Sequence, residues 1–368
     1  RPVKMTYTRE DEFQNAYVRQ GLHINIKTAV RNDGKIIGSK NVLAWDGGAY
    51  TEYGVNIVKA AGWGCVGPYD IENIATDSYC VYTNHPVGGP YRGFGMCEIH
   101  FGIEQNIDMI AHEMGIDPFE MRKLNGIRVG GKSATGQTIE VAGYQECLDR
   151  AAKLMDLDKP SAPSGSPTKL RGKGIAGGWK APSMPTDVAS SVIIRMNEDG
   201  TFMLLASCQD IGQGSDTIMA QIAAETLTVP VEKISVRTGD TDHTPYEWQT
   251  VASRSTYCAG NATKLAAEDL RNKILELAQI KMGTWKNDLY LEGGFVCRKF
   301  YPDQKVPLAA FALGLTLPDQ SGIGGPMIGV GSFVVPNNIA ADKKTGLSPK
   351  PVAFWSMGVN GAEVEVDT

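Results

Sequence analysis

Two predicted β-hairpins, each followed along the chain by a glycine-rich turn and a helix, limit how this protein can fold. Residues 22–50 contain two strand-like runs on either side of Asp33-Gly34, and residues 190–207 contain two around Asp199-Gly200. An Asp-Gly pair between two such runs is a strong signal for a tight hairpin turn. The repeated order of hairpin, turn and helix indicates two domains built on one plan.

A segment rich in proline and serine separates the two parts. Residues 158–168 read DKPSAPSGSPT, a composition typical of a linker. We therefore expect a first domain over residues 1–160 and a second over residues 161–368, each of them partial. The chain starts with Arg rather than Met, and its last residues, AEVEVDT, alternate like a strand. We expect this chain to be the central piece of a longer polypeptide.

Apolar residues spaced three or four positions apart predict the main helices. The stripe of the first long helix, which should end at Gly115, consists of Ile99, Ile103, Ile107, Ile110 and Met114. Further helices are predicted over residues 118–125, 143–155, 216–227 and 264–279, and strands over residues 201–207, 233–239 and 353–368. Residues 284–350 are rich in glycine and proline, and we expect them to be irregular.

The composition excludes several classes of protein. A net charge of −5 disfavours nucleic acid as the main partner, because proteins that bind phosphate backbones concentrate lysine and arginine. No apolar run approaches the ~20 residues that span a bilayer, so we expect no membrane association. The seven cysteines are widely spaced and include no Cys-x-x-Cys pair, which indicates a reduced, cytoplasmic protein without a zinc or iron–sulfur signature.

Three predicted helices begin after runs of small residues: GGPYRGFG at 88–95, DIGQGSDT at 210–217 and TVASRSTYCAGNA at 250–262. The first N–H groups of a helix are free and partly positive, and glycine lets a ligand approach the backbone. One such run is most simply a connection, but three together favour a large polar or anionic cofactor. The spacings leave a Rossmann site unsupported and exclude a P-loop.

These runs and the segment GIEQNIDMIAHEMGIDPFEMRKLN resemble the motifs of one family. In order and spacing they are similar to the molybdenum-cofactor (large) subunit of the xanthine dehydrogenase/aldehyde oxidase family, the molybdenum hydroxylases. The similarity extends from RPVKMTYTREDEF to the terminal EVEVD, and so covers nearly the whole chain. It implies an α+β fold of molybdopterin-binding domains, in which β-hairpins and mixed sheets pack against helices.

The resemblance also implies a cofactor and a reaction. Family members hold molybdenum through the dithiolene of a molybdopterin, in some cases the cytosine dinucleotide form, so no protein ligand to the metal is expected. They hydroxylate aldehydes or N-heterocyclic aromatics with oxygen from water, and electrons leave through iron–sulfur clusters and FAD on partner domains or subunits. The resemblance thus implies one part of a hetero-oligomeric oxidoreductase, inactive without its missing segments or partners. The substrate stays open.

The matching motifs assign residues to the expected site. Cofactor contacts are carried over to Arg92, Gly93, Phe94, Gly95, Gly212, Gln213, Gly214, Ala252, Ser253 and Arg254. Phe94 would also form the wall against which a flat substrate packs. Trp179 lies in a segment that often lines the substrate pocket, with ordinary core packing as its alternative.

The chain departs from the family pattern in three ways. The catalytic glutamate belongs to a Gly-Val-Gly-Glu type motif that is missing here, so the base is expected downstream and no catalytic residue is assigned. Gly93 stands where carbon monoxide dehydrogenases have a copper-binding cysteine, which disfavours CO oxidation. Ala60 stands where xanthine oxidisers have an arginine, which makes purine recognition by that route doubtful. The alternative function is a degenerate, non-catalytic module of the same fold without cofactor.

Several other polar residues have simpler structural interpretations. Asp240, Asp242 and His243 are residue types that form a metal or an acid/base site, but turn capping near the cofactor loop explains them more simply. His85 and His100 near the first glycine-rich run are most simply structural histidines. Glu98 follows that run at a position that is not catalytic in the family.

Overall fold

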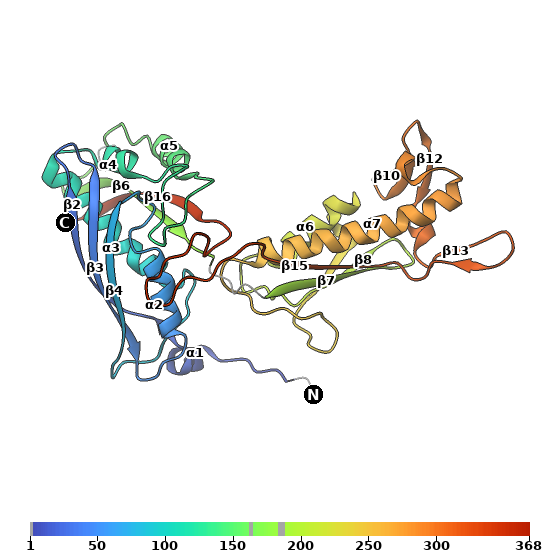
Figure 1. Ribbon diagram of the computed structural model, residues 1–368, viewed down its shortest axis with the longest axis horizontal. Coiled ribbons are helices and arrows are strands. Elements are labelled where there is room, and N and C mark those ends of the chain that lie inside the picture. Colours follow the sequence, from blue (N-terminus) through green and yellow to red (C-terminus); the bar gives the residue numbers. More distant parts are fainter. Residues whose placement is uncertain (1–2, 162–164, 183–187) are drawn as a thin grey trace. The chain divides into compact units, whose positions relative to one another are not determined.

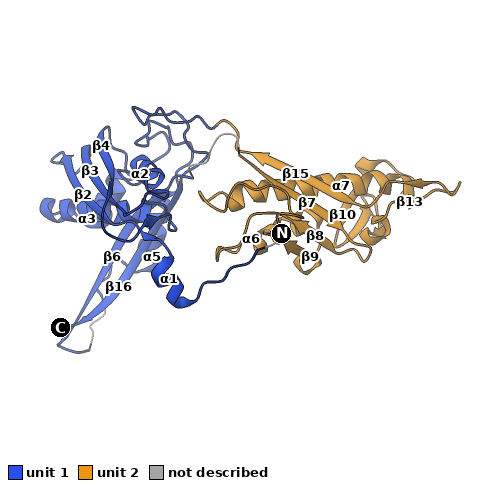
Figure 2. Cartoon of the chain, turned by 90° about the horizontal axis from the view of Figure 1, so that it is seen from below, with its two compact units in different colours: residues 1–183, 338–368 blue, residues 184–337 orange. Residues whose placement is uncertain are grey.

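The computed structural model describes residues 3–161, 165–182 and 188–368. Unit 1 comprises residues 1–183 and 338–368, and unit 2 comprises residues 184–337 (Figure 2). The sequence-based boundary at residue 160 divides the chain into consecutive domains, whereas the compact units are interleaved, because residues 338–368 return to unit 1. The predicted linker, residues 158–168, includes residues 162–164, which lie outside the described residues.

Unit 1 contains helices and two sets of paired strands beside a short parallel pair (Figure 1). Its helices are α1 (Arg9–Asn15), α2 (Gly54–Trp63), α3 (Met96–Met114), α4 (Pro118–Asn125) and α5 (Tyr144–Leu154). Its strands are β1 (Val18–Arg19), β2 (Leu22–Val30), β3 (Ile36–Gly48), β4 (Asn73–Tyr82), β5 (Gly88–Gly89), β6 (Lys169–Lys180) and β16 (Ser356–Asp367).

The predicted hairpin at Asp33-Gly34 is confirmed. β2 and β3 pair antiparallel, and Gly34 adopts a left-handed φ of +86° in the turn between them. β4 joins β3 in parallel, so the three strands form a mixed sheet. Of the predicted apolar stripe of α3, Ile99, Ile103 and Ile107 are buried in the core of unit 1, and the remaining two residues pack half-buried against it. α3 ends at Gly115 as expected.

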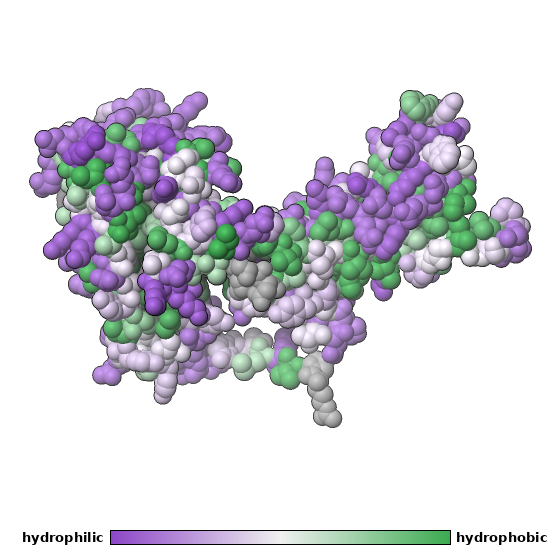
Figure 3. Space-filling model, in the orientation of Figure 1, coloured by the Kyte–Doolittle hydropathy of each residue, from purple (hydrophilic) through white to green (hydrophobic). Residues whose placement is uncertain are grey.

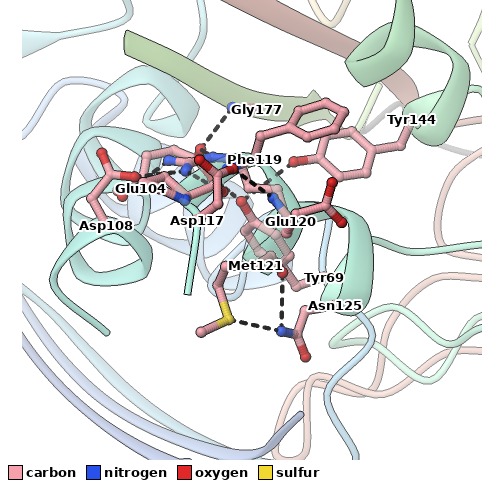
Figure 4. A network of polar contacts seen from close by, with 12 residues as sticks. Tyr69, Glu104, Asp108, Asp117, Phe119, Glu120, Met121, Asn125, Tyr144 and Gly177 are labelled. Carbon is pink, nitrogen blue, oxygen red and sulfur yellow. Dashed lines mark hydrogen bonds and ion pairs between the residues drawn. The ribbon is translucent and has the colours of Figure 1, made fainter. Parts of the chain in front are cut away.

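A buried polar network ties α3 to α4 and to β6 (Figure 4). Arg122, fully buried on α4, donates to Glu104 on α3 at 2.8 Å and to Asp108 at 2.6 Å. Glu104 also accepts from the Tyr69 hydroxyl at 2.6 Å and from the Gly177 N–H at 2.7 Å. Burial, reinforced by the nearby Glu104 carboxylate, raises the pKa of Tyr69 well above its ordinary value. Because buried charges are tolerated only when paired, the network fixes how these elements pack.

The predicted terminal strand is β16, and its neighbour is β6 in the same chain. The two strands pair antiparallel over their full length, with Lys180 opposite Ser356. On one face, Glu365 accepts from Lys169 at 2.9 Å and from Arg171 at 2.8 Å. Unit 2 is therefore an insertion between two paired strands of unit 1.

Unit 2 is built on a four-stranded sheet with satellite hairpins. Its strands are β7 (Ala189–Met196), β8 (Phe202–Leu205), β9 (Ile234–Arg237), β10 (Leu289–Glu292), β11 (Phe295–Arg298), β12 (Tyr301–Pro307), β13 (Leu315–Thr316), β14 (Gly322–Ile323) and β15 (Ile328–Val334). Its helices are α6 (Ser215–Leu227) and α7 (Gly260–Met282), with the 3₁₀ turns η1 (Val231–Lys233), η3 (Lys286–Asp288) and η4 (Leu308–Phe311), and the π-helical turn η2 (Ser255–Ala259).

The sheet of unit 2 has the order β15-β7-β8-β9. The hairpin predicted at Asp199-Gly200 is confirmed by the antiparallel pairing of β7 with β8, and β9 joins β8 in parallel. α6 and α7 cover one face, where Ile194, Phe202 and Leu270 are among the buried residues of the core. Hydrophilic residues cover the outward side of α7 (Figure 3). Both units thus combine helices with mixed sheets, which confirms the α+β prediction.

The prediction that residues 284–350 are irregular is wrong for β10 to β15. The clearest case is β15, which pairs with β7 and completes the sheet. A Cβ atom at Gly329 or Gly331 would lie 2.1 Å from the Ala266 carbonyl oxygen or 2.2 Å from that of Ala262. These glycines let the backbone of α7 lie directly on the strand, so glycine marks close packing here rather than a loop. In the described part of the chain, no helix is both long and apolar enough to cross a membrane.

Candidate functional site

The first glycine-rich turn, formed by Gly93, Phe94 and Gly95, joins β5 to α3 in unit 1. All three residues are left-handed, with φ of +109°, +54° and +86°. A non-glycine residue holds this conformation at a cost of roughly 1–2 kcal/mol. Two backbone hydrogen bonds close the turn, from the Phe94 N–H to Tyr91 O at 2.8 Å and from the Met96 N–H to Gly93 O at 3.2 Å.

The glycines of this first turn are packed against their own chain. A Cβ atom at Gly93 would lie 2.5 Å from Cys97 Sγ. One at Gly95 would lie 3.0 Å from Ala61 Cβ and 3.1 Å from the Ile57 carbonyl oxygen. No larger residue fits at either position without moving its neighbours, so the glycines are required by packing as well as by conformation.

The two aromatic residues predicted to line a substrate pocket belong to unit 1. Phe94 is half-buried and packs against the core of the unit. Trp179 is only 3% exposed, and its ring stacks on Trp355 at a centroid distance of 4.0 Å. Its indole nitrogen has no hydrogen-bond partner in the described residues. Trp179 therefore contributes to the core of unit 1, and a contact with substrate stays a prediction for both residues.

The second turn, Gly212 to Gly214, precedes α6 in unit 2. Both glycines are left-handed, with φ of +101° and +79°. The amide of Gln213 braces the turn from within: its oxygen accepts from the Ile211 N–H at 2.7 Å, and its nitrogen donates to the Gln209 carbonyl at 3.0 Å. No heavy atom lies within 4 Å of a Cβ built on either glycine, so this turn is open.

The loop of Ala252, Ser253 and Arg254 leads into η2 and α7. Ala252 and Ser253 both have a φ of +55°, and are thus two consecutive left-handed residues with side chains. The Arg254 guanidinium is 1% exposed, forms an ion pair with Glu247, which is 3% exposed, and donates to Ser190 Oγ at 3.1 Å. Arg254 thus braces the loop through its side chain. No sequence pattern points to Glu247, because its pairing with Arg254 depends on the fold of the loop.

The structure brings the second turn and this loop together. The carbonyl oxygen of Gln209 accepts from Gln213 Nε2 and from Thr250 Oγ1, each at 3.0 Å. The π-helical turn η2 follows immediately, and such turns occur frequently at functional sites. Two of the three predicted motifs therefore form one continuous surface of unit 2.

The chemistry of this surface suits a polar ligand. The start of α6 and the left-handed turns carry backbone N–H groups of the kind that bind anions. The Gly212 N–H already donates to Asp210 Oδ1 at 2.8 Å, and the Ile211 N–H donates to the Gln213 amide oxygen. Asp216 supplies a hydrogen-bond acceptor, because its buried Oδ1 has no hydrogen-bond partner in the described residues. Burial, and then the charge of Asp210, raise the pKa of Asp216. The surface thus offers one orphaned acceptor, while Asp210 and Gln213 already occupy two of its backbone donors.

The other titratable residues singled out in the sequence have local partners. Asp240 accepts from the Asp242 N–H at 3.0 Å and pairs with His243 Nδ1 at 2.9 Å, which caps a turn as expected. His85 pairs with Asp46. Within residues 3–161, 165–182 and 188–368, no group of three His, Cys, Asp or Glu side chains could hold a metal ion.

Comparison with known proteins assigns the chain to a family. Residues 1–126 and residues 150–368 match two family models, each described as a molybdopterin cofactor-binding domain. Over 82% of its length the chain is 33% identical to the putative xanthine dehydrogenase molybdenum-binding subunit XdhA of Escherichia coli K12. The chain belongs to the molybdenum-cofactor subunit family of xanthine dehydrogenases and aldehyde oxidases.

Other members of this molybdenum-cofactor subunit family agree with the assignment. The aldehyde oxidoreductase of Megalodesulfovibrio gigas is 32% identical over 73% of the chain, which spans 30% of that protein. The solved structure of aldehyde oxidoreductase from Desulfovibrio gigas matches 98% of the chain with a TM-score of 0.77 and 26% identity. The chain spans 41% of the length of the E. coli relative and 36% of that solved chain.

Proposed function

We propose that this chain binds molybdopterin through the second turn and the adjoining loop of unit 2. The observation that carries the proposal is the open space at Gly212 and Gly214, where two left-handed glycines before a helix leave the backbone accessible. The left-handed φ values favour glycine with or without a ligand, so the proposal rests on the empty space beside these two glycines. The open turn therefore favours a binding role over a degenerate module.

The residues present fit this cofactor. Molybdopterin carries a phosphate and a pterin ring with both N–H and carbonyl groups on its edge. Asp210 accepts from the Gly212 N–H, so the phosphate and the carbonyl oxygens would use the other backbone N–H groups of this turn and of the helix start. The orphaned Oδ1 of Asp216 suits an N–H donor. Gln213, Ala252, Ser253 and Arg254 would contribute by shaping this backbone surface, with Arg254 acting through its buried pair with Glu247.

We further propose that the protein is one part of a molybdenum-dependent oxidoreductase. When bound, the cofactor would supply redox chemistry for hydroxylating an aldehyde or an N-heterocycle with oxygen from water. The first turn would present Arg92, Gly93, Phe94 and Gly95, with Phe94 orienting a flat substrate through its ring. Iron–sulfur and flavin partners and a base outside this chain would complete catalysis. The names of the E. coli and M. gigas relatives support this class of activity.

Metal and pterin analysis of the intact complex tests the proposal. We expect near-stoichiometric molybdenum, measured by elemental mass spectrometry, and pterin, measured by fluorescence after oxidation. Gln213→Ala removes the brace of the second turn, and should lower occupancy about tenfold. Gln105→Ala is a matched control, because Gln105 is an exposed glutamine whose amide donates to the Phe101 carbonyl within α3. An intact wild-type complex without molybdenum and pterin would support the degenerate module instead.

A further inference from the structure

Arg19, on β1 of unit 1, contacts the first turn from outside it. One guanidinium nitrogen donates to the Arg92 carbonyl oxygen at 2.7 Å, and the other donates to Glu98 Oε1 at 3.0 Å. The same group lies 4.6 Å from the centroid of the Tyr91 ring. The Arg19 side chain therefore links the segment before the first glycine-rich turn, through Tyr91 and the Arg92 carbonyl, to Glu98 at the start of α3.

The backbone position of Arg19 is fixed by strand pairing. β1 pairs in parallel with β5, and places Arg19 opposite Gly89, just before the turn. A Cβ atom at Gly89 would lie 2.4 Å from the Tyr17 ring, so the two segments touch closely. The Glu98 side chain is only 10% exposed, which strengthens its pairing with Arg19 relative to a surface pair. The backbone of Arg19 is thus fixed by the pairing of β1 with β5, and its guanidinium by Glu98.

The bond to the Arg92 carbonyl has a geometric consequence. In a trans peptide the C=O and N–H groups point in opposite directions. A donor that fixes the Arg92 carbonyl therefore also fixes the direction of the Gly93 N–H, the first donor of the turn. Three left-handed residues follow, and Phe94 among them is strained. The second turn is braced by its own Gln213, whereas the first turn has, besides its own two backbone hydrogen bonds, a brace from a residue 73 positions away.

We propose that Arg19 is a positioning residue for the first turn, and sets the direction of the Gly93 N–H and the Phe94 ring for ligand binding. This inference rests on the proposed function of the turn. Arg19 would not itself contact the ligand, because its guanidinium is engaged by the Arg92 carbonyl and Glu98. It acts through the peptide between Arg92 and Gly93, and a bidentate guanidinium suits that role better than a single ammonium.

Hydrogen exchange in the native complex, prepared with and without cofactor, tests the inference. Arg19→Gln should speed amide exchange of residues 93–96 about tenfold, because a charge-assisted hydrogen bond is lost. Exchange of the α3 interior, residues 103–111, should stay unchanged, which a merely structural role would not predict. Arg19→Lys should restore part of the protection. Arg31→Gln is the matched control, since Arg31 pairs with Asp33 in the β2–β3 hairpin.

The two proposals fail in different ways. Unchanged exchange at residues 93–96 in a folded Arg19→Gln or Arg19→Lys complex would overturn the positioning role, whatever the cofactor content. Equal acceleration in the turn and in the α3 interior would also overturn it. Faster exchange confined to the turn supports it. If molybdenum content then stays at the wild-type level, Arg19 still positions the turn, but the turn does not help to retain the cofactor.

Discussion

The two glycine-rich turns look alike in sequence and differ in what surrounds them. Both combine left-handed glycines with the start of a helix. At Gly93 and Gly95 the space for a side chain is taken by Cys97, Ile57 and Ala61. At Gly212 and Gly214 that space is empty. Glycine therefore serves close packing in the first turn and access for a ligand in the second.

The two turns also differ in which residues hold their conformation. The first turn is held by packing and by Arg19 from a distant strand. The second is held by the short-range bonds of Gln213, and its neighbouring loop by the buried pair of Arg254 with Glu247. The comparison teaches that a glycine pattern identifies a turn, whereas the neighbours decide its role.

The largest expected effect is on packing at the first turn. Gly95→Val places a β-branched side chain at a left-handed position that is already in contact with Ala61 and Ile57. We expect unit 1 to lose about 4 kcal/mol of unfolding free energy, measured by denaturant titration. Gly115→Val, at the other end of α3, is the control: its φ is +65° but nothing lies within 4 Å. Equal losses for both variants would show that strain, and not packing, distinguishes the first turn.

The next effect concerns the loop beside the second turn. Glu247→Gln leaves the buried Arg254 charge without its partner, and should destabilise unit 2 by about 3 kcal/mol. Glu276→Gln breaks an exposed pair with Lys286 in the same unit, and should change stability by less than about 1 kcal/mol. Local hydrogen exchange at residues 250–256 measures the difference. If both variants behave alike, the buried pair does not hold the loop.

An effect of about the same size should appear when unit 1 is acidified. Burial, with a minor contribution from Lys180, lowers the pKa of His100 to about 4 from 6.5. The unfolded chain then binds a proton near pH 6.5, while the folded chain does so only near pH 4. Stability is therefore complete above pH 6.5, and falls by about 3 kcal/mol between pH 6.5 and 4. His100→Gln should flatten this slope. If the substitution leaves the pH dependence of stability unchanged, groups other than His100 cause that dependence.

The smallest stability effect is expected at the open turn. Gly212→Ala adds a methyl group into empty space, so it should reduce stability only by the left-handed strain, about 1 kcal/mol. Gly293→Ala is matched, since that glycine is also left-handed and open. The two variants should melt alike, yet only Gly212→Ala should lose molybdenum from the intact complex. Equal retention would indicate that the open turn does not receive the cofactor.

Local patterns in the sequence predicted the hairpins and helices well. Asp33-Gly34 and Asp199-Gly200 are turns because their geometry is set by neighbouring residues alone. Segments whose structure depends on distant partners were missed. β15 was predicted to be irregular because Gly329 and Gly331 fit a loop composition, and only the backbone of α7 explains them.

The candidate site shows the same limit. The motifs located both turns and the Ala252–Arg254 loop, because small residues before a helix form a local pattern. The sequence did not reveal that Arg254 points into a buried pair with Glu247, nor that Arg19 reaches the Arg92 carbonyl. Both contacts join segments whose approach is set by the tertiary fold.

The pairing of β6 with β16 has a consequence for how the protein is made. Lys180 is synthesised long before Ser356, its partner across the ribbon. At ordinary rates of translation the first strand waits on the order of ten seconds or more for the second. All of unit 2 emerges from the ribosome in that interval. During this interval the edge of β6 is unpaired, and a chaperone or a strand of another chain can bind there before β16 does.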